Sequence, residues 1–221
     1  MEARELINPR ITPLHPSDKV SQIQRLMERS ETSVLPVVDG LTFKGMVTNQ
    51  ILNTTKPSDW TVSQLPLEKT SCVVYSVQHF LEAVRTIDQH NSPLVAVIDP
   101  NAHYQGAIVR EDLITAVGQT LQINSKGAIL VISTHKTDRL LSEVARIIES
   151  KGTEILYSSI TGRTVGTGLS ELTVKINKEN SAELVPLLES EGYLVTAIFG
   201  EVISDGYHKE RIDNFFSFLN T

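Results

Sequence analysis

The sequence contains one pattern twice, at a spacing of about sixty residues. Sliding residues 11–53 along the chain by that distance places the apolar run VLPVVD over LVAVID. After one extra residue in the next loop, the glycine of KGMVTNQIL falls on the glycine of QGAIVREDLI. We call the two occurrences copy one (residues 11–53) and copy two (residues 71–114). Neither is long enough to bury both faces of its own sheet, so we expect the copies to pack against each other.

Both copies have the same local pattern. The first helix has an apolar face in each, formed by Val20, Ile23 and Met27 in copy one and by Phe80, Ala83 and Ile87 in copy two. We expect Ser17 to cap this helix in copy one. A short apolar run, a turn, a second strand and a second helix follow, which gives the order β-α-β-β-α.

The composition limits the classes of protein that this chain can belong to. It has 221 residues, 40% of them hydrophobic and 21% charged, which suits two soluble globular domains. The net charge is -6, with no clustered surplus of Lys and Arg, so we expect no nucleic-acid partner. No apolar run approaches the length of a membrane span, so we expect no membrane partner.

Two further features indicate a cytoplasmic protein. The first residues, MEARELINPR, lack the apolar core of a signal peptide. The single cysteine, Cys72, cannot form an intramolecular disulfide, which fits a reducing compartment. We therefore expect a cytoplasmic location.

The order ITPLHPSDKV, VLPVVDG, KGMVTNQIL resembles a CBS domain, and the second copy resembles its partner. Together they resemble a Bateman module, with one CBS domain over residues 1–60 and the other over residues 61–122. The resemblance implies that adenosine ligands occupy a cleft between the paired units. It also implies a loop Gly-h-h-[Ser/Thr]-x-x-Asp, where h is apolar, whose hydroxyl faces phosphate or ribose. The Asp of that loop binds the ribose hydroxyls, since a carboxylate can accept two hydrogen bonds from a cis-diol.

Each copy keeps one half of that loop motif. Copy one has Thr48 at the hydroxyl position but Ile51 at the Asp position. Copy two has Asp112 but carries Val109 where the hydroxyl would be. Losing the carboxylate removes a charge-assisted hydrogen bond of about 1.5–3 kcal/mol, so we expect the surviving site to be in copy two.

The expected site in copy two combines Asp112 for ribose and Arg110 for phosphate. The backbone at Cys72 and Val73, in the segment aligned with Ile11 and Thr12, would face an adenine edge. The candidate ligand-binding residues are therefore Cys72, Val73, Arg110, Asp112, Ile11, Thr12 and Thr48. The expected regulatory ligands are AMP, ADP, ATP or S-adenosylmethionine, with no other cofactor. The alternative is that Asp112 only caps its helix or faces solvent, and that Thr48 only satisfies a loop amide.

Residues 127–202 follow a different pattern, β-α-β-β-α-β, which is a ferredoxin-like order. The helix over residues 138–152 is expected to bury Leu141, Val144 and Ile148 and to stop at Gly152. The fold class is thus α/β and α+β, with tandem CBS domains followed by a ferredoxin-like domain.

In length and order, residues 127–202 resemble an ACT domain, a regulatory module that often binds amino acids. Where that family has Asp-x-Pro-Gly, this chain has HKTDR, 135–139, so amino-acid binding is not expected. The domain order also resembles that of bacterial acetoin-utilisation accessory proteins. The tail, residues 205–221, carries an apolar set at helical spacing that would pack on its own chain or on another subunit: Ile212, Phe215, Phe216 and Leu219.

The sequence shows no catalytic or metal-binding motif. The six histidines are scattered, without a cysteine partner or a close pair, so no metal site is expected. The glycine-rich stretch over residues 162–170 lacks the Gly-Lys-[Ser/Thr] ending of a P-loop and is expected to be a hairpin loop. We therefore expect no enzyme activity.

Two functional hypotheses remain. The first is a homodimeric regulatory protein that senses an adenosine-containing ligand and acts on a protein partner. The second is an interaction scaffold whose CBS pair has lost its ligand. A nucleotide-binding assay separates the two.

Overall fold

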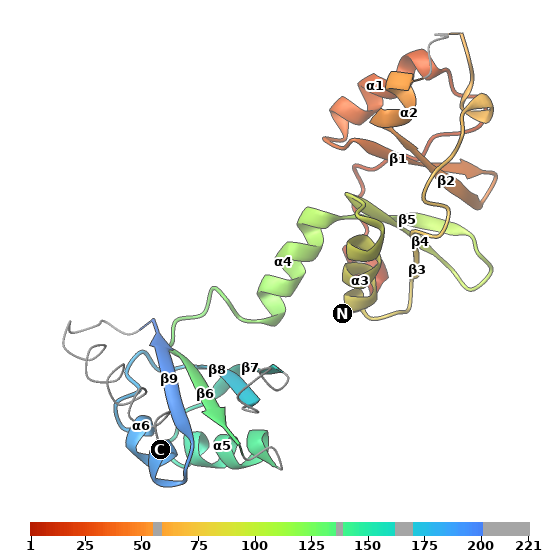
Figure 1. Cartoon of the computed structure of the whole chain (residues 1–221). Coiled ribbons are helices and arrows are strands. Elements are labelled where there is room, and N and C mark those ends of the chain that lie inside the picture. The colour runs from red at the N-terminus through yellow and green to blue at the C-terminus, as the bar shows by residue number, and fades with distance from the viewer. Residues whose placement is uncertain (55–58, 136–138, 162–169, 201–221) are drawn as a thin grey trace. The chain divides into compact units, whose positions relative to one another are not determined.

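The computed structural model describes residues 1–54, 59–135, 139–161 and 170–200. The chain divides into two compact units, Met1–Val117 and Gly118–Thr221. Figure 1 labels their helices and strands.

Copy one folds as predicted around a two-stranded antiparallel sheet. A short extended segment at Leu14 pairs in parallel with Val37. It is followed by α1 (Val20–Arg29), β1 (Val34–Asp39), β2 (Thr42–Thr48) and α2 (Asn49–Thr54). The expected Ser17 cap is wrong: the helix begins at Val20 after Lys19, whose side chain makes no capping hydrogen bond. Asp18 instead accepts from the His15 N–H at 2.7 Å, which closes a tight turn ahead of the helix.

Copy two repeats this order with a third strand in its sheet. Its elements are β3 (Val73–Tyr75), α3 (Phe80–His90), β4 (Leu94–Ile98), β5 (Tyr104–Val109) and α4 (Arg110–Thr120). Strand β3 is parallel to β4, and β4 is antiparallel to β5. The duplicated β-α-β-β-α order is therefore confirmed.

Equivalent residues of the two copies contact each other. Thr42 bridges to His103, and the Phe43 and Tyr104 rings stack with centroids 6.4 Å apart and planes 17° apart. Counterparts contact each other in this way where they lie close to an approximate twofold axis between the copies. One continuous hydrophobic core contains buried residues of both copies.

The segment that precedes each copy packs on the other copy. The N-terminal segment (residues 1–8) includes a 3-10 helix, Ala3–Leu6, and lies along copy two. The Ala3 N–H donates to Gln78 O at 2.8 Å, and the Asn8 N–H donates to Ala107 O at 2.8 Å. A Cβ at Gly106 would lie 2.4 Å from Ile7 Cγ2, so only glycine permits this close approach.

The linker segment (residues 60–68) makes the reciprocal contact with copy one. It includes a 3-10 helix, Val62–Gln64. Its Trp60 carbonyl accepts from the Val20 N–H at 2.9 Å. Glu68 exchanges two backbone hydrogen bonds with Met46, at 2.8 and 2.9 Å. The sequence boundary near residue 60 therefore does not separate two self-contained halves.

The second unit has the ferredoxin-like arrangement. Its elements are β6 (Ile129–Thr134), α5 (Leu140–Glu149), β7 (Ile155–Thr161), β8 (Ser170–Ile176), α6 (Leu184–Ser190) and β9 (Leu194–Phe199). The sheet order is β7-β8-β6-β9, with every neighbouring pair antiparallel. Helices α5 and α6 share one hydrophobic core with the sheet, and Figure 1 shows both helices next to it.

Helix α5 corrects one detail of the sequence analysis. Leu141 is 41% exposed, and the buried position is taken by its neighbour Leu140 together with Val144 and Ile148. The helix begins at Leu140, so its core-facing set starts one residue earlier than expected. Gly152 adopts φ +59°, the left-handed conformation that ends such a helix.

The expected tail helix (residues 205–221) and most of the glycine-rich stretch lie outside the described residues. Every helix in the described ranges is too short or too polar to cross a bilayer.

Candidate functional site

The two halves of the split motif lie at the same place in each copy, where a strand runs directly into a helix. Strand β2 ends at Thr48 and α2 begins at Asn49. Strand β5 ends at Val109 and α4 begins at Arg110, which puts Asp112 in the first turn of α4. A carboxylate is favourable there, because the free N–H groups of a helix start attract negative charge.

Asp112 is half-buried and is held by a residue of the N-terminal segment. Its Oδ2 accepts a hydrogen bond from Asn8 Nδ2 at 2.8 Å. The Asn8 side chain is itself fixed, because its Oδ1 accepts from the Arg10 N–H at 2.9 Å. Within the described ranges, Asp112 Oδ1 has no hydrogen-bond partner. Asn8 was missed by the sequence analysis because nothing local links it to a residue 104 positions away.

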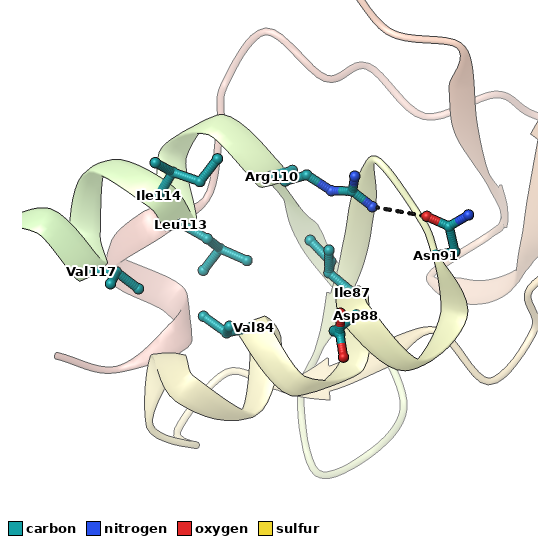
Figure 2. A pocket seen from close by; sticks show the side chains of 8 residues that line it. All are labelled: Val84, Ile87, Asp88, Asn91, Arg110, Leu113, Ile114 and Val117. Atoms are coloured by element: carbon teal, nitrogen blue, oxygen red, sulfur yellow. Dashed lines mark hydrogen bonds between the residues drawn. The ribbon is translucent and has the colours of Figure 1, made fainter. Parts of the chain in front are cut away.

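Arg110 and Asp112 are not brought together. Arg110 Nη2 donates to Ser92 O at 2.9 Å and reaches Asn91 Oδ1 at 3.4 Å, as Figure 2 shows for the second contact. Side chains two residues apart on a helix point in different directions, and here they diverge toward α3 and toward the N-terminal segment. The expected pairing of Arg110 with a phosphate next to Asp112 therefore gains no support from this geometry.

Cys72 is fully buried and its polar groups are already used. Its thiol donates to Leu94 O at 3.4 Å, and burial raises the pKa of the thiol. Its backbone N–H donates to Lys69 O at 3.0 Å, and its carbonyl accepts from the Ala96 N–H at 3.1 Å. The Cys72 N–H is therefore not free for an adenine edge.

Strand pairing adjusts the alignment of the two first strands. Val74 pairs with Val97 in copy two, as Leu14 pairs with Val37 in copy one. Cys72 thus corresponds to Thr12 and not to Ile11, and half-buried Val73 corresponds to Pro13. Ile11 is buried in the core and Thr12 is exposed.

In copy one the retained hydroxyl also meets a residue from the preceding segment. Thr48 Oγ1 donates to Glu68 Oε2 at 3.4 Å and accepts from the Ile51 N–H at 3.3 Å. Ile51, at the motif's Asp position, is 3% exposed and belongs to the hydrophobic core. Copy one thus has a carboxylate near its hydroxyl, but the carboxylate comes from the linker segment.

A separate groove of about 380 Å³ runs between α3 and α4. Apolar side chains form its floor and polar groups form one end (Figure 2); the lining residues are Val84, Ile87, Asp88, Asn91, Arg110, Leu113, Ile114 and Val117. Ile114, which lines this groove, is 65% exposed.

Over the described part of the chain, no group of three or more His, Cys, Asp or Glu side chains could hold a metal ion.

Comparison with known proteins agrees with this fold. The family model for the CBS domain matches residues 3–50. The chain is similar to a CBS domain pair/ACT domain protein from Thermotoga maritima, with a TM-score of 0.50 and 20% identity over 55% of this chain and 99% of that one. The family model and this structure together show that the chain contains the fold of a CBS domain pair.

Two further solved structures resemble the chain less closely. CBS domains of a transcriptional regulator from Streptococcus pneumoniae give a TM-score of 0.48 at 18% identity, covering 52% of this chain and 98% of that one. CBSX2 in complex with AMP gives 0.46 at 19% identity, covering 56% and 98%. A search of curated proteins returned no match to the chain.

Proposed function

We propose that this protein is a regulatory sensor whose CBS pair binds an adenosine-containing ligand at the copy-two cleft. The observation that carries the proposal is Asp112, a half-buried carboxylate at a helix start with one oxygen held by Asn8 and the other without a partner in the described ranges. Such an oxygen suits a ribose hydroxyl. The expected ligands are AMP, ADP, ATP or S-adenosylmethionine.

The proposed mechanism is a shift between conformations. A ligand at Asp112 would favour one packing of the two copies, because the cleft is bordered by a segment that continues into copy one. The C-terminal ferredoxin-like unit, which we propose to be ACT-like, or a protein partner would respond to that change. No catalytic step is part of this proposal.

A thermal-shift panel of AMP, ADP, ATP and S-adenosylmethionine tests the sensor hypothesis. A ligand present at about one hundred times its Kd stabilises the folded state by about 2.7 kcal/mol. Asp112→Ala should abolish the shift, whereas Glu111→Ala, an exposed carboxylate on the same helix turn, should leave it unchanged. A shift that Asp112→Ala spares and Thr48→Ala removes would place the site in copy one.

The scaffold hypothesis is the second candidate, and the split motif favours it. Ile51 and Val109 remove one polar group from each cleft, and Ile51 is committed to the core. If all four compounds leave the melting temperature of the wild-type protein unchanged, the sensor hypothesis is rejected in favour of the scaffold hypothesis.

We further propose that a homodimer forms through the α3–α4 groove. Asp88 and Arg110 lie on the same surface, so a second copy rotated by 180° can place the charges opposite each other. Ile114→Glu should yield monomers in sedimentation velocity, because it puts a charge on the apolar floor. Ile123→Glu, at a residue 61% exposed elsewhere, should not. Dimers that persist in Ile114→Glu would exclude this surface.

A further inference from the structure

We propose that Asn8 is a positioning residue for the copy-two site: it fixes the Asp112 carboxylate and adds a donor beside it. The part of this inference that concerns the ligand rests on the proposed function, whereas the contact between Asn8 and Asp112 does not depend on it. It gives the N-terminal segment, which leads into copy one, a direct role at the Asp112 loop of copy two.

Three contacts determine how the Asn8 side chain is oriented. Its backbone N–H donates to Ala107 O at 2.8 Å, which ties the residue to β5 two positions before that strand ends. Its Oδ1 accepts from the Arg10 N–H at 2.9 Å, as in an Asx turn. The amide nitrogen must then face Asp112, because the reversed amide would set two oxygens against each other there.

The pair Asn8–Asp112 has a chemical preference. Asp112 Oδ1 can accept a hydrogen bond, and Asn8 Nδ2 has a second N–H that it can donate. A hydroxyl both donates and accepts, so one hydroxyl, or two on neighbouring carbons, can satisfy both partners. An ammonium group can only donate and would leave the amide N–H unused. The pair therefore favours a ribose diol, and 2′-deoxyribose would lose part of the interaction.

Copy one has a related contact at the equivalent loop, although it is made at the hydroxyl position, Thr48, and not at the Asp position. Glu68 lies about sixty residues after Asn8, and its side chain reaches Thr48 at the equivalent loop. In copy one the hydrogen-bond partner comes from the linker segment, which precedes copy two. In copy two it comes from the N-terminal segment, which precedes copy one. A carboxylate is added to a hydroxyl in copy one, and a donor is added to a carboxylate in copy two.

The first test needs no ligand. Asn8→Asp retains an oxygen for the Arg10 N–H but places a second carboxylate against Asp112. Two carboxylates at this distance do not both ionise freely, so the folded variant holds a proton that the unfolded chain releases. The melting temperature of the variant should lie closest to that of wild type near pH 4, where the unfolded chain also keeps its carboxyl protons, and should fall several degrees below wild type as pH rises to 8. Arg10, Arg110 and Glu111, the charged residues nearest in sequence to the pair, are unchanged in the variant.

The matched control is Asn49→Asp, the same change at an exposed side chain in the first turn of α2. Its melting temperature relative to wild type should stay flat or rise slightly with pH, since a carboxylate is favourable at a helix start. If Asn8→Asp and wild type have parallel pH profiles, Asn8 does not hold Asp112 in solution and the inference is overturned.

The second test measures binding by calorimetry with AMP and 2′-deoxy-AMP. Asn8→Ala should weaken AMP about tenfold and should reduce the preference for AMP over 2′-deoxy-AMP. Unchanged AMP affinity and unchanged preference would overturn the ligand role of Asn8. If wild type binds neither nucleotide while Asn8→Asp shows the pH-dependent loss, the proposed function fails and the positioning of Asp112 stands.

Discussion

Copy one and copy two share the β-α-β-β-α order, but the equivalent loops have different hydrogen-bond partners. In copy one the loop supplies a hydroxyl, Thr48, and the linker segment supplies the carboxylate of Glu68. In copy two the loop supplies the carboxylate of Asp112, and the N-terminal segment supplies the amide of Asn8. The second hydrogen bond is much shorter, 2.8 Å against 3.4 Å.

The difference teaches that the hydrogen-bond partner of a loop residue can come from a distant segment of the chain. Judged by their loops alone, the two copies are each half complete. Judged by what surrounds the loops, each contains a donor and a carboxylate. The two copies differ most at Ile51, which has become part of the core and cannot serve a polar ligand.

The largest expected effect is at that position. Ile51→Asp restores the loop motif in copy one but buries a carboxylate in place of a packed side chain, which should destabilise the first unit by about 4 kcal/mol. Ile51→Val should cost about 1 kcal/mol. Urea unfolding followed by the fluorescence of Trp60, the single tryptophan, reports on this unit. A stable Ile51→Asp variant that gains nucleotide binding would show that copy one is a dormant site.

The next prediction concerns the glycines at which the N-terminal segment and the linker segment closely approach the opposite copy. Gly106→Ala should cost about 3 kcal/mol, because φ is +156° and the new Cβ would lie 2.4 Å from Ile7. Gly45→Ala should cost about 2 kcal/mol, because its nearest neighbour, Leu67 Cβ, is 3.0 Å away. Gly40→Ala, with φ +61° and no atom within 4 Å, should cost about 1 kcal/mol. The same urea experiment ranks the three variants by their loss of unfolding free energy. Equal losses for Gly45→Ala and Gly106→Ala would contradict the expected difference between the two close approaches.

Tyr104 and its counterpart Phe43 differ by one hydroxyl, and that hydroxyl is buried without a partner in the described ranges. Tyr104→Phe should therefore stabilise the first unit by about 1 kcal/mol. Burial raises the pKa of Tyr104, so the folded state holds the proton above the pH at which the unfolded chain releases it. The free energy of unfolding of wild type should fall as pH rises above about 10, and Tyr104→Phe should lack that part of the fall. A less stable variant would mean that the hydroxyl has a partner in solution.

The smallest expected effects compare the Thr48–Glu68 hydrogen bond with the Asn8–Asp112 hydrogen bond. Glu68→Ala should change the stability of the first unit by about 0.5 kcal/mol or less, since Glu68 is exposed and its hydrogen bond is long. Asp112→Ala should cost about 1 kcal/mol, because it leaves the half-buried Asn8 amide without its acceptor. Chemical denaturation at neutral pH measures both. A larger cost for Glu68→Ala would reverse the ranking of the two clefts.

The repeat, the strands and most helix faces were readable from the sequence, because apolar spacing and turn residues are local signals. Alternation of this kind also accounts for the buried face of β8, where Leu172, Val174 and Ile176 are all fully buried. Helix starts were predicted less accurately. The side chains near Ser17 and Leu141 are compatible with a helix that begins at any of several neighbouring residues. Tertiary contacts decide between such neighbours.

The candidate site was predictable only in part. Asp112 was found because it lies in a recognisable loop. Arg110 was grouped with it because it is near in sequence, although its position on the helix sends it toward Ser92. Asn8 and Glu68 carry no local pattern at all. They reach the site because segments exchange between the copies, and no spacing within either copy encodes that exchange.

The exchanged segments also determine what happens when the chain is shortened. Deleting residues 1–8 removes from copy one the Asn8 carbonyl that accepts from the Ile11 N–H at 3.3 Å. The larger effect is on copy two, which loses the contacts of the N-terminal segment. In the intact chain Ala3 is fully buried and Ile7 fills the space next to Gly106. A protease that trims this leading stretch would therefore act at long range, loosening β5 and α4 while leaving α1 and β1 in place.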